Sequence, residues 1–370
     1  MKRKILSGFL LLFLIYCGWF IYQSLAFHTF TQENIQTYPD EIKGVYHLHS
    51  TLSDGHEPPE KIARIAADND VDFIILTDHG NPNFESMAAR GWRHGVLMLA
   101  GSELSVNRGH LVGIGFDTPE HRFSQNAEES ASQIARLNGI SIIAHPYSRV
   151  SWTWGDLFIY SGIEIMNASS SVRRDFAPLI PYLPAYIIRP DLFLIRMLDT
   201  PLKNLKKWDR LNRKHTVYAY FSIDAHFYYG PLFRLFRIHI LINAPLPKEF
   251  DAARNMVYKA LKKGSFYNAI DSAAEAKGFR FFGASGENRI DMGQSPRFDP
   301  SITLHVQAPF PFKKVIHLIR NGETVSESEQ DSLFFRVKSP GVYRIEVFLK
   351  GRTPLKKEIP WIVSNPIFLR

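Results

Sequence analysis

Histidines and carboxylates gather in a few short motifs, and these side chains are the ones best suited to binding metals. In chain order the motifs are His47-Leu48-His49 with Ser53-Asp54-Gly55, Thr77-Asp78-His79, Gly101-Ser102-Glu103 with His110 after it, His145-Pro146, and Asp224-Ala225-His226. A single histidine is more often an ordinary core or surface residue than a ligand. The recurrence of imidazole and carboxylate groups instead favours Mn, Zn or Fe(II), and disfavours Ca or an all-Mg site.

Cysteine usage limits the ligands to nitrogen and oxygen. Cys17 is the only cysteine, and it lies in an uncharged N-terminal stretch. The rest of the chain has no thiol, which excludes disulfides and cysteine–zinc sites. Several carboxylates in one site would allow metals to lie close together.

The ends of predicted strands carry most of the motifs. Apolar runs of strand length alternate with helical patterns at Pro58–Asp68 and Ala127–Leu137, which predicts an α/β fold with a parallel sheet or barrel. The predicted strands are Val45–His49, Phe73–Thr77, Val96–Ala100, His110–Phe116, Ile140–Ala144, Gly162–Met166, Val217–Ile223 and Ile238–Ile242. Active sites of α/β barrels assemble at the C-terminal ends of strands, so this placement favours an enzyme.

The N-terminus has the composition of a membrane anchor. Lys2, Arg3 and Lys4 precede Ile5–Tyr22, which holds no charged residue. A helix of that length covers roughly 27 Å, close to the thickness of the hydrocarbon layer. No Lys or Arg follows until Lys43. The positive-inside rule therefore predicts a cytoplasmic basic tip and transmembrane anchor over residues 1–25, with the catalytic part outside. The alternative is a signal peptide cleaved near Ala26.

Beyond a polar linker (26–43), composition divides the chain into a catalytic domain (44–292) and a C-terminal domain (297–370). The C-terminal part shows short alternating strands with a hairpin turn at Asn321-Gly322, which predicts a small β-sandwich. Residues 168–215 interrupt the α/β pattern and predict a helical insertion. This insertion either roofs the site, lies on the membrane surface or packs on the barrel. The formal charge of +8 fits an anionic substrate or merely a basic surface, and does not indicate nucleic-acid binding.

The motifs, in this order and approximate spacing, resemble those of the PHP (polymerase and histidinol phosphatase) family over about residues 44–292. A looser similarity, on Gly341-Val342-Tyr343-Arg344 and Ser364-Asn365-Pro366-Ile367, is to a PHP branch with a C-terminal β domain. The resemblance implies a distorted seven-stranded α/β barrel that holds three divalent metals (Mn, Zn or Fe). One metal would take His47, His49, Glu103 and Asp224; a second Glu103, His110 and His145; the third Asp54, His79 and His226.

Three further residues are candidates for catalytic roles. Asp78 lies beside a predicted ligand histidine and would orient it or accept a proton, unless it only caps the next segment. Arg108 and Arg149 follow the Glu103 and His145 motifs and would clamp a phosphate, unless they are surface residues.

The resemblance implies hydrolysis of a phosphomonoester or phosphodiester of a small anionic molecule by a metal-bound hydroxide. The same cluster could instead hydrolyse a carbamate, amide or ester, because the similar tailed branch includes carbamate hydrolysis. A third alternative is a non-catalytic metal- or ligand-binding module at the cell surface. The β domain would dock on the barrel or on an envelope partner. A DNA-polymerase partner is not expected for an exported chain.

Overall fold

Strand β1 (Glu41–Leu48) lies inside the largest sheet and carries His47 near its end. The computed structural model describes residues 2–26, 41–116, 118–119, 121–147, 152–155, 159–172, 177–242, 244–351 and 353–370. The sheet has the order β16-β15-β18-β19-β11-β10-β1-β2-β4-β3, with β20 paired to β18. Its other strands are β2 (Phe73–Leu76), β3 (Gly91–Arg93), β4 (Val96–Ala100), β10 (Arg237–Leu241), β11 (Phe266–Ala269), β15 (Lys314–Arg320), β16 (Glu323–Ser328), β18 (Gly341–Leu349), β19 (Ile362–Ser364) and β20 (Ile367–Leu369).

A second sheet, of order β5-β6-β7-β8-β9, faces the same site, and a third has the order β13-β12-β14-β17. The second sheet consists of β5 (Ser102–Val106), β6 (Gly109–Ile114), β7 (Ile140–Ile143), β8 (Gly162–Asn167) and β9 (Tyr218–Ser222). The third consists of β12 (Arg280–Ser285), β13 (Asn288–Asp291), β14 (Thr303–Gln307) and β17 (Ser332–Arg336). The α/β class is confirmed.

The two sheets around the site are mixed rather than wholly parallel. Strands β1-β2-β4 and β7-β8-β9 are parallel, whereas β10 joins β1 and β5-β6-β7 pair with antiparallel geometry. Among the described residues the sheets meet at isolated bridges, Leu48 with Ala225 and His79 with Glu103, and form no continuous closed ladder. The expected barrel therefore appears here as two open sheets. The first bridge lies next to predicted ligands in the chain, and the second joins two of them.

The helices follow the apolar periodicity of the sequence. Helix α2 (Pro59–Asp68) buries Ile62, Ala63 and Ala66, and α4 (Ala127–Arg136) begins where the Asn126 side chain accepts hydrogen bonds from two backbone N–H groups. Both helices were predicted. The predicted insertion is helical as well, with α5 (Ala168–Val172), the 3₁₀ helix η1 (Ala177–Tyr182), α6 (Leu183–Ile188), α7 (Pro190–Met197) and α8 (Leu202–Asn212). The remaining helices are α3 (Phe84–Ala88), α9 (Tyr229–Leu235) and α10 (Phe250–Lys263).

The C-terminal strands pack directly on the metal-binding part of the chain. Strand β12 pairs with β14, and β19 pairs with β11, so strand pairing crosses the predicted boundary near residue 292. The buried Arg344 of β18 reaches Asp209 of α8 with two hydrogen bonds of 2.8 and 2.9 Å. The predicted turn at Asn321-Gly322 is present, with φ angles of 54° and 91°. A separate 297–370 domain stays a prediction.

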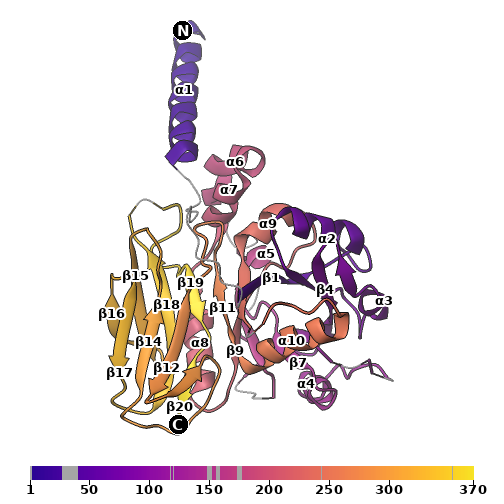
Figure 1. Ribbon diagram of the computed structural model, residues 1–370. Helices are drawn as coiled ribbons and strands as arrows, with labels where there is room; N and C mark the ends of the chain where they lie inside the picture. Colours follow the sequence, from indigo (N-terminus) through magenta and orange to yellow (C-terminus); the bar gives the residue numbers. More distant parts are fainter. Residues whose placement is uncertain are drawn as a thin grey trace.

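Helix α1 (Lys2–Ala26) projects away from the rest of the chain, with α6 and α7 beside its C-terminal end (Figure 1). Its apolar stretch Ile5–Leu25 is long enough to cross a membrane. A signal sequence near an N-terminus has the same length and composition, so anchoring and orientation stay predictions.

Candidate metal centre

The structure brings all nine predicted ligands together in three overlapping groups. They are His49, Asp54, His79 and His226; His47, His49, Glu103 and Asp224; and Glu103, His110 and His145. Within each group, one nitrogen or oxygen atom of every residue lies within 4.8 Å of the others. The groups equal those that the family resemblance implies, except that His49 also faces the Asp54 group.

Glu103 stands at the centre of the nine side chains. Its Oε2 lies 3.2 Å from Nε2 of both His47 and His49, and its Oε1 lies 2.7 Å from His110 Nδ1 and 3.0 Å from His145 Nε2. The carboxylate is buried, and its two oxygens face different groups. This is the position that a ligand shared between two cations requires.

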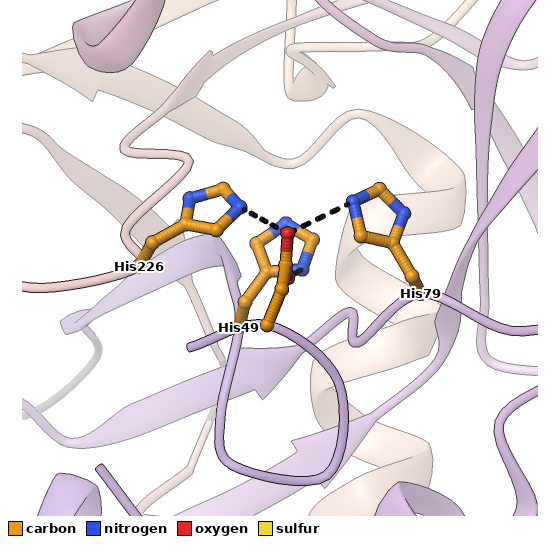
Figure 2. Close-up of side chains that lie close together, drawn as sticks. His49, His79 and His226 are labelled. Atoms are coloured by element: carbon orange, nitrogen blue, oxygen red, sulfur yellow. Dashed lines mark ion pairs between the residues drawn. The ribbon is translucent and has the colours of Figure 1, made fainter. Parts of the chain in front are cut away.

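The outer group lies around Asp54. Figure 2 shows His49, His79 and His226 pointing toward one another. Asp54 Oδ2 is 3.2 Å from His226 Nε2 and 3.7 Å from His79 Nε2, and Asp54 Oδ1 is 3.4 Å from His49 Nδ1. Asp54 is half exposed, so this group forms the open side of the centre.

Unpartnered buried nitrogens test whether the centre fits divalent cations. Among the described residues, His47 Nε2 and both ring nitrogens of His49 are buried without a hydrogen-bond partner. Such groups are costly to bury unless something binds them. Each faces carboxylate oxygens that have lone pairs of their own. Nitrogen and oxygen lone pairs that converge in this way match the ligand preference of Mn, Zn or Fe, so the residues fit these ions.

The backbone is unusual at three of the nine positions. His47, His145 and Asp224 have φ angles of 66°, 26° and 49°, in the left-handed region that side chains disfavour. Such conformations cost on the order of 1–3 kcal/mol each and cluster at functional sites. Here they turn the strand ends so that these side chains point into the centre.

Asp78 fixes the loop that carries Asp54. Its Oδ1 accepts hydrogen bonds from Ser50 N (2.6 Å) and Ser53 Oγ (2.7 Å), and its Oδ2 accepts from the hydroxyls of Ser50 (2.9 Å) and Ser86 (2.5 Å). A Cβ at Gly55 would lie 2.3 Å from the His49 carbonyl oxygen, so the loop requires glycine there. These contacts give Asp78 a positioning role; orienting a histidine or accepting a proton stays a prediction.

Of the two predicted phosphate clamps, the described one, Arg108, is held by groups other than the predicted ligands. Arg108 Nη1 donates to the Thr153 carbonyl (2.8 Å), and Nη2 lies 3.3 Å from Glu128 Oε1. Arg149 lies outside the described residues. Phosphate binding by either arginine therefore stays a prediction.

Glu164 belongs to the site but was not among the predicted residues. It is buried on β8, where its Oε1 lies 2.6 Å from His47 Nδ1 and its Oε2 accepts from His145 N at 2.8 Å. When Glu164 accepts a hydrogen bond from His47 Nδ1–H, the lone pair of His47 lies on Nε2 and is directed at the centre. The available signal was a carboxylate inside the apolar run Gly162–Met166.

Mutual attraction sets the charges of the centre. Burial alone raises the pKa of Glu103, but His47, His110 and His145 outweigh it and hold that pKa well below its usual range. Burial acts likewise on Asp224, yet His47 and His49 lower its pKa to about 2. Both carboxylates are therefore ionised at neutral pH and attract cations.

The insertion forms one wall of a small cavity beside the centre. The cavity is lined by His145 and Tyr147 and, from the insertion, by Ser171, Thr200 and Asn204. The Tyr147 ring lies 5.6 Å from the Trp152 ring. Polar and aromatic groups therefore border the side of the centre next to His145.

Comparison with known proteins finds no matching family model and no matching curated protein. Among solved structures, the chain is similar to a two-domain Bacteroides vulgatus protein containing a predicted PHP-like metal-dependent phosphoesterase. The identity is 13% and the TM-score 0.45, over 91% of this chain and 99% of that one. A Chromobacterium violaceum amidohydrolase with bound sulfate and no metal matches at 18% identity and TM-score 0.34, over 56% and 96%.

A lesion-specific endonuclease from Pyrococcus furiosus matches at 14% identity and TM-score 0.37, over 68% of this chain and 64% of that one. With TM-scores below 0.5, none of the three decides the fold or the activity of this chain.

Proposed function

We propose that this chain is a metal-dependent hydrolase that cleaves phosphoesters of small anionic molecules. The observation that carries the proposal is the convergence of nine side chains with nitrogen and oxygen ligand atoms, Glu103 at their centre, with buried imidazole nitrogens that lack hydrogen-bond partners. Divalent cations supply, when bound, Lewis acidity that polarises a phosphoryl oxygen and acidifies water.

The residues of the chain would hold the cations and position the ligands. The nine ligands would hold three cations, with Glu103 shared between two. Glu164 fixes the orientation and tautomer of His47, and Asp78 fixes the loop of Asp54. Since such partners orient ligands, both residues act through the centre and not on the substrate. The proposed location is the outer side of a membrane, with α1 as the anchor.

Hydrolysis of a carbamate, amide or ester is the second candidate, and two observations favour it. The Arg108 guanidinium is held by Thr153 and Glu128 rather than aimed at the centre. The Tyr147 ring lines the cavity beside His145 and lies 5.6 Å from the Trp152 ring. An aromatic side chain at the cavity, with the described Arg108 held by other groups, suits a neutral carbonyl substrate better than a phosphate.

The test is turnover of paired substrates by the full chain in detergent, loaded with Mn or Zn. The proposal expects cleavage of nitrophenyl phosphomonoesters or phosphodiesters, and loss of that cleavage in Glu103→Gln. Cleavage of the matching carboxylic or carbamate esters alone would move the assignment to carbonyl hydrolysis. Full metal occupancy without turnover of either panel would contradict the hydrolase proposal.

A further inference from the structure

An apolar surface is exposed by η1 and α6, within the insertion. The stretch 177–188 holds no charged side chain and ends at Arg189. Among its described side chains, the exposed large apolar ones are Ile180, Leu183, Tyr186, Ile187 and Ile188, of which Ile187 is 83% exposed and Ile188 64%. An uncharged run of this length is typical of a buried core helix or of an interfacial segment, and its exposure excludes the first. We call these five side chains the α6 surface.

Helix α6 lies beside the C-terminal end of α1 (Figure 1). Tyr16 Oη donates to the Pro181 carbonyl at 2.9 Å, and the rings of Trp19 and Tyr182 are 5.3 Å apart. Nearer the C-terminal end of α1, the Ser24 carbonyl accepts a hydrogen bond from Arg189 of the insertion. Arg196 Nη2 lies 3.4 Å from Gln23 Oε1. The apolar end of the insertion therefore meets the apolar part of α1, and its arginines meet the end of α1.

The length of α1 sets the depth at which these contacts occur. Residues 5–15 are exposed on every side, but such a segment covers only about 17 Å of the ~30 Å hydrocarbon layer. If α1 crosses a bilayer, the rest of the span must come from residues beyond Tyr16. The side chains that pack on Tyr16 and Trp19 then lie at the depth of lipid.

We infer that the α6 surface is a second membrane-contacting element, seated in the interfacial layer of the bilayer that α1 crosses. Arg189 and Arg196 then lie level with the lipid phosphates, while the isoleucines reach roughly 5–10 Å into the headgroup and acyl boundary. Tyr186 of this surface stacks on Tyr228 at 4.5 Å, two residues after His226. The contact places the metal centre next to the membrane. The inference depends on α1 crossing the membrane and is independent of the hydrolase proposal.

Depth-dependent fluorescence quenching tests this position. In a Cys17→Ser background, which removes the only cysteine, Ile187→Cys is labelled with an environment-sensitive fluorophore. The full chain is reconstituted into phosphatidylcholine–phosphatidylglycerol vesicles that contain a lipid with a spin label on its acyl chain. Ile15→Cys on α1 is the reference for a position inside the hydrocarbon layer. Phe334→Cys, on a side chain that is 64% exposed on β17, is the solvent reference.

We expect quenching at position 187 to reach at least about half of that at position 15, because an interfacial helix lies only a few ångströms above the acyl chains. Position 334 shows none. Quenching at 15 with none at 187 would overturn the inference, since α1 would then cross the bilayer without the α6 surface. Absence of quenching at both positions would overturn it as well, because the span on which it depends would be missing.

Discussion

Strand β1 carries two buried polar clusters that use the same residue types in opposite ways. At its start, Glu41 Oε1 lies 2.5 Å from Tyr267 Oη and 2.9 Å from His239 Nδ1, and Glu41 Oε2 lies 2.5 Å from Arg280 Nη1. His239 Nε2 lies 3.1 Å from both carboxylate oxygens of Asp271. We call Glu41, His239, Tyr267, Asp271 and Arg280 the Glu41 cluster. In this cluster each charge is neutralised by a neighbour.

At the end of the same strand, the metal centre leaves His47 Nε2 and both His49 nitrogens without hydrogen-bond partners. Burial is nearly complete in both places, so burial does not separate the two. The two clusters differ in whether their buried polar atoms have hydrogen-bond partners. A cluster that closes on itself stabilises the fold, whereas one whose lone pairs converge on an open position is suited to a cation.

The largest effect is expected from a substitution that breaks the Glu41 cluster. Glu41→Gln leaves His239 and Arg280 as buried cations without their shared carboxylate, and breaking a buried ion pair in this way costs about 3–5 kcal/mol. We expect the free energy of unfolding to fall by that amount in urea titrations, with metal content per folded chain unchanged. Glu60→Gln, which removes an exposed pairing with Arg93 and His94, is the control and changes little. Metal loss in Glu41→Gln would join the two clusters and refute the contrast.

Glu103→Gln changes the metal centre instead. Loss of an outer partner of a metal ligand costs about 10–100-fold, so loss of the shared ligand itself is expected to cost at least about 100-fold in metal affinity and turnover. Stability without metal is expected to fall as well, because the Glu103 carboxylate pairs with His110 and His145 and its pKa is held well below its usual range. Metal competition and turnover assays measure the effect, with Asp251→Asn on the exposed face of α10 as the matched carboxylate control. Wild-type metal affinity in Glu103→Gln would contradict the proposed shared role.

Glu164 sharpens the comparison, since it is fully partnered and yet belongs to the metal centre. We expect Glu164→Ala to lower metal affinity by about 10–100-fold, because His47 loses the acceptor that fixes its tautomer. Glu164→Gln keeps an acceptor oxygen and is expected to lose less. Chelator titrations separate the two variants. Equal affinities in both variants and the wild type would place Glu164 with the structural residues.

The smallest effect concerns pH. Burial lowers the pKa of His239, but Asp271 and Glu41 outweigh burial and raise it to about 9. Since the ordinary value is about 6.5, protonated His239 stabilises the fold fully below about pH 6.5 and this contribution is lost as pH rises through about 9. The urea midpoint of the wild type should therefore decline across that range. His239→Gln should flatten the decline, and an equal slope in both proteins would exclude His239 as its source.

The sequence predicted the metal centre better than its surroundings. Motifs such as Thr77-Asp78-His79 follow strand runs directly, so their convergence could be expected from strand ends alone. Glu164 was missed because its neighbours are apolar and a strand residue gives no sign of which partner it faces. His47, His145 and Asp224 lie among the other predicted ligands, but their left-handed backbone has no signature in residue type.

Pairing direction explains the other omissions. Apolar period does not distinguish parallel from antiparallel strands, so the antiparallel pairing of β10, itself predicted as a strand, was not anticipated. Strand β11 and the Glu41 cluster were not predicted either. The contacts between α1 and the insertion join residues about 165 positions apart, as in Tyr16 with Pro181. Composition left three placements open for residues 168–215. Only the fold shows that the middle of this insertion lies beside α1, while Ser171, Thr200 and Asn204 line the cavity.

Metal content tests the central claim most directly. The full chain, purified in detergent without chelators, is analysed by mass spectrometry for divalent metals beside Glu103→Gln. The account predicts three equivalents of Mn, Zn or Fe per wild-type chain, one for each group of ligands, and fewer in the variant. One equivalent or none in the wild type after incubation with these metals would contradict it.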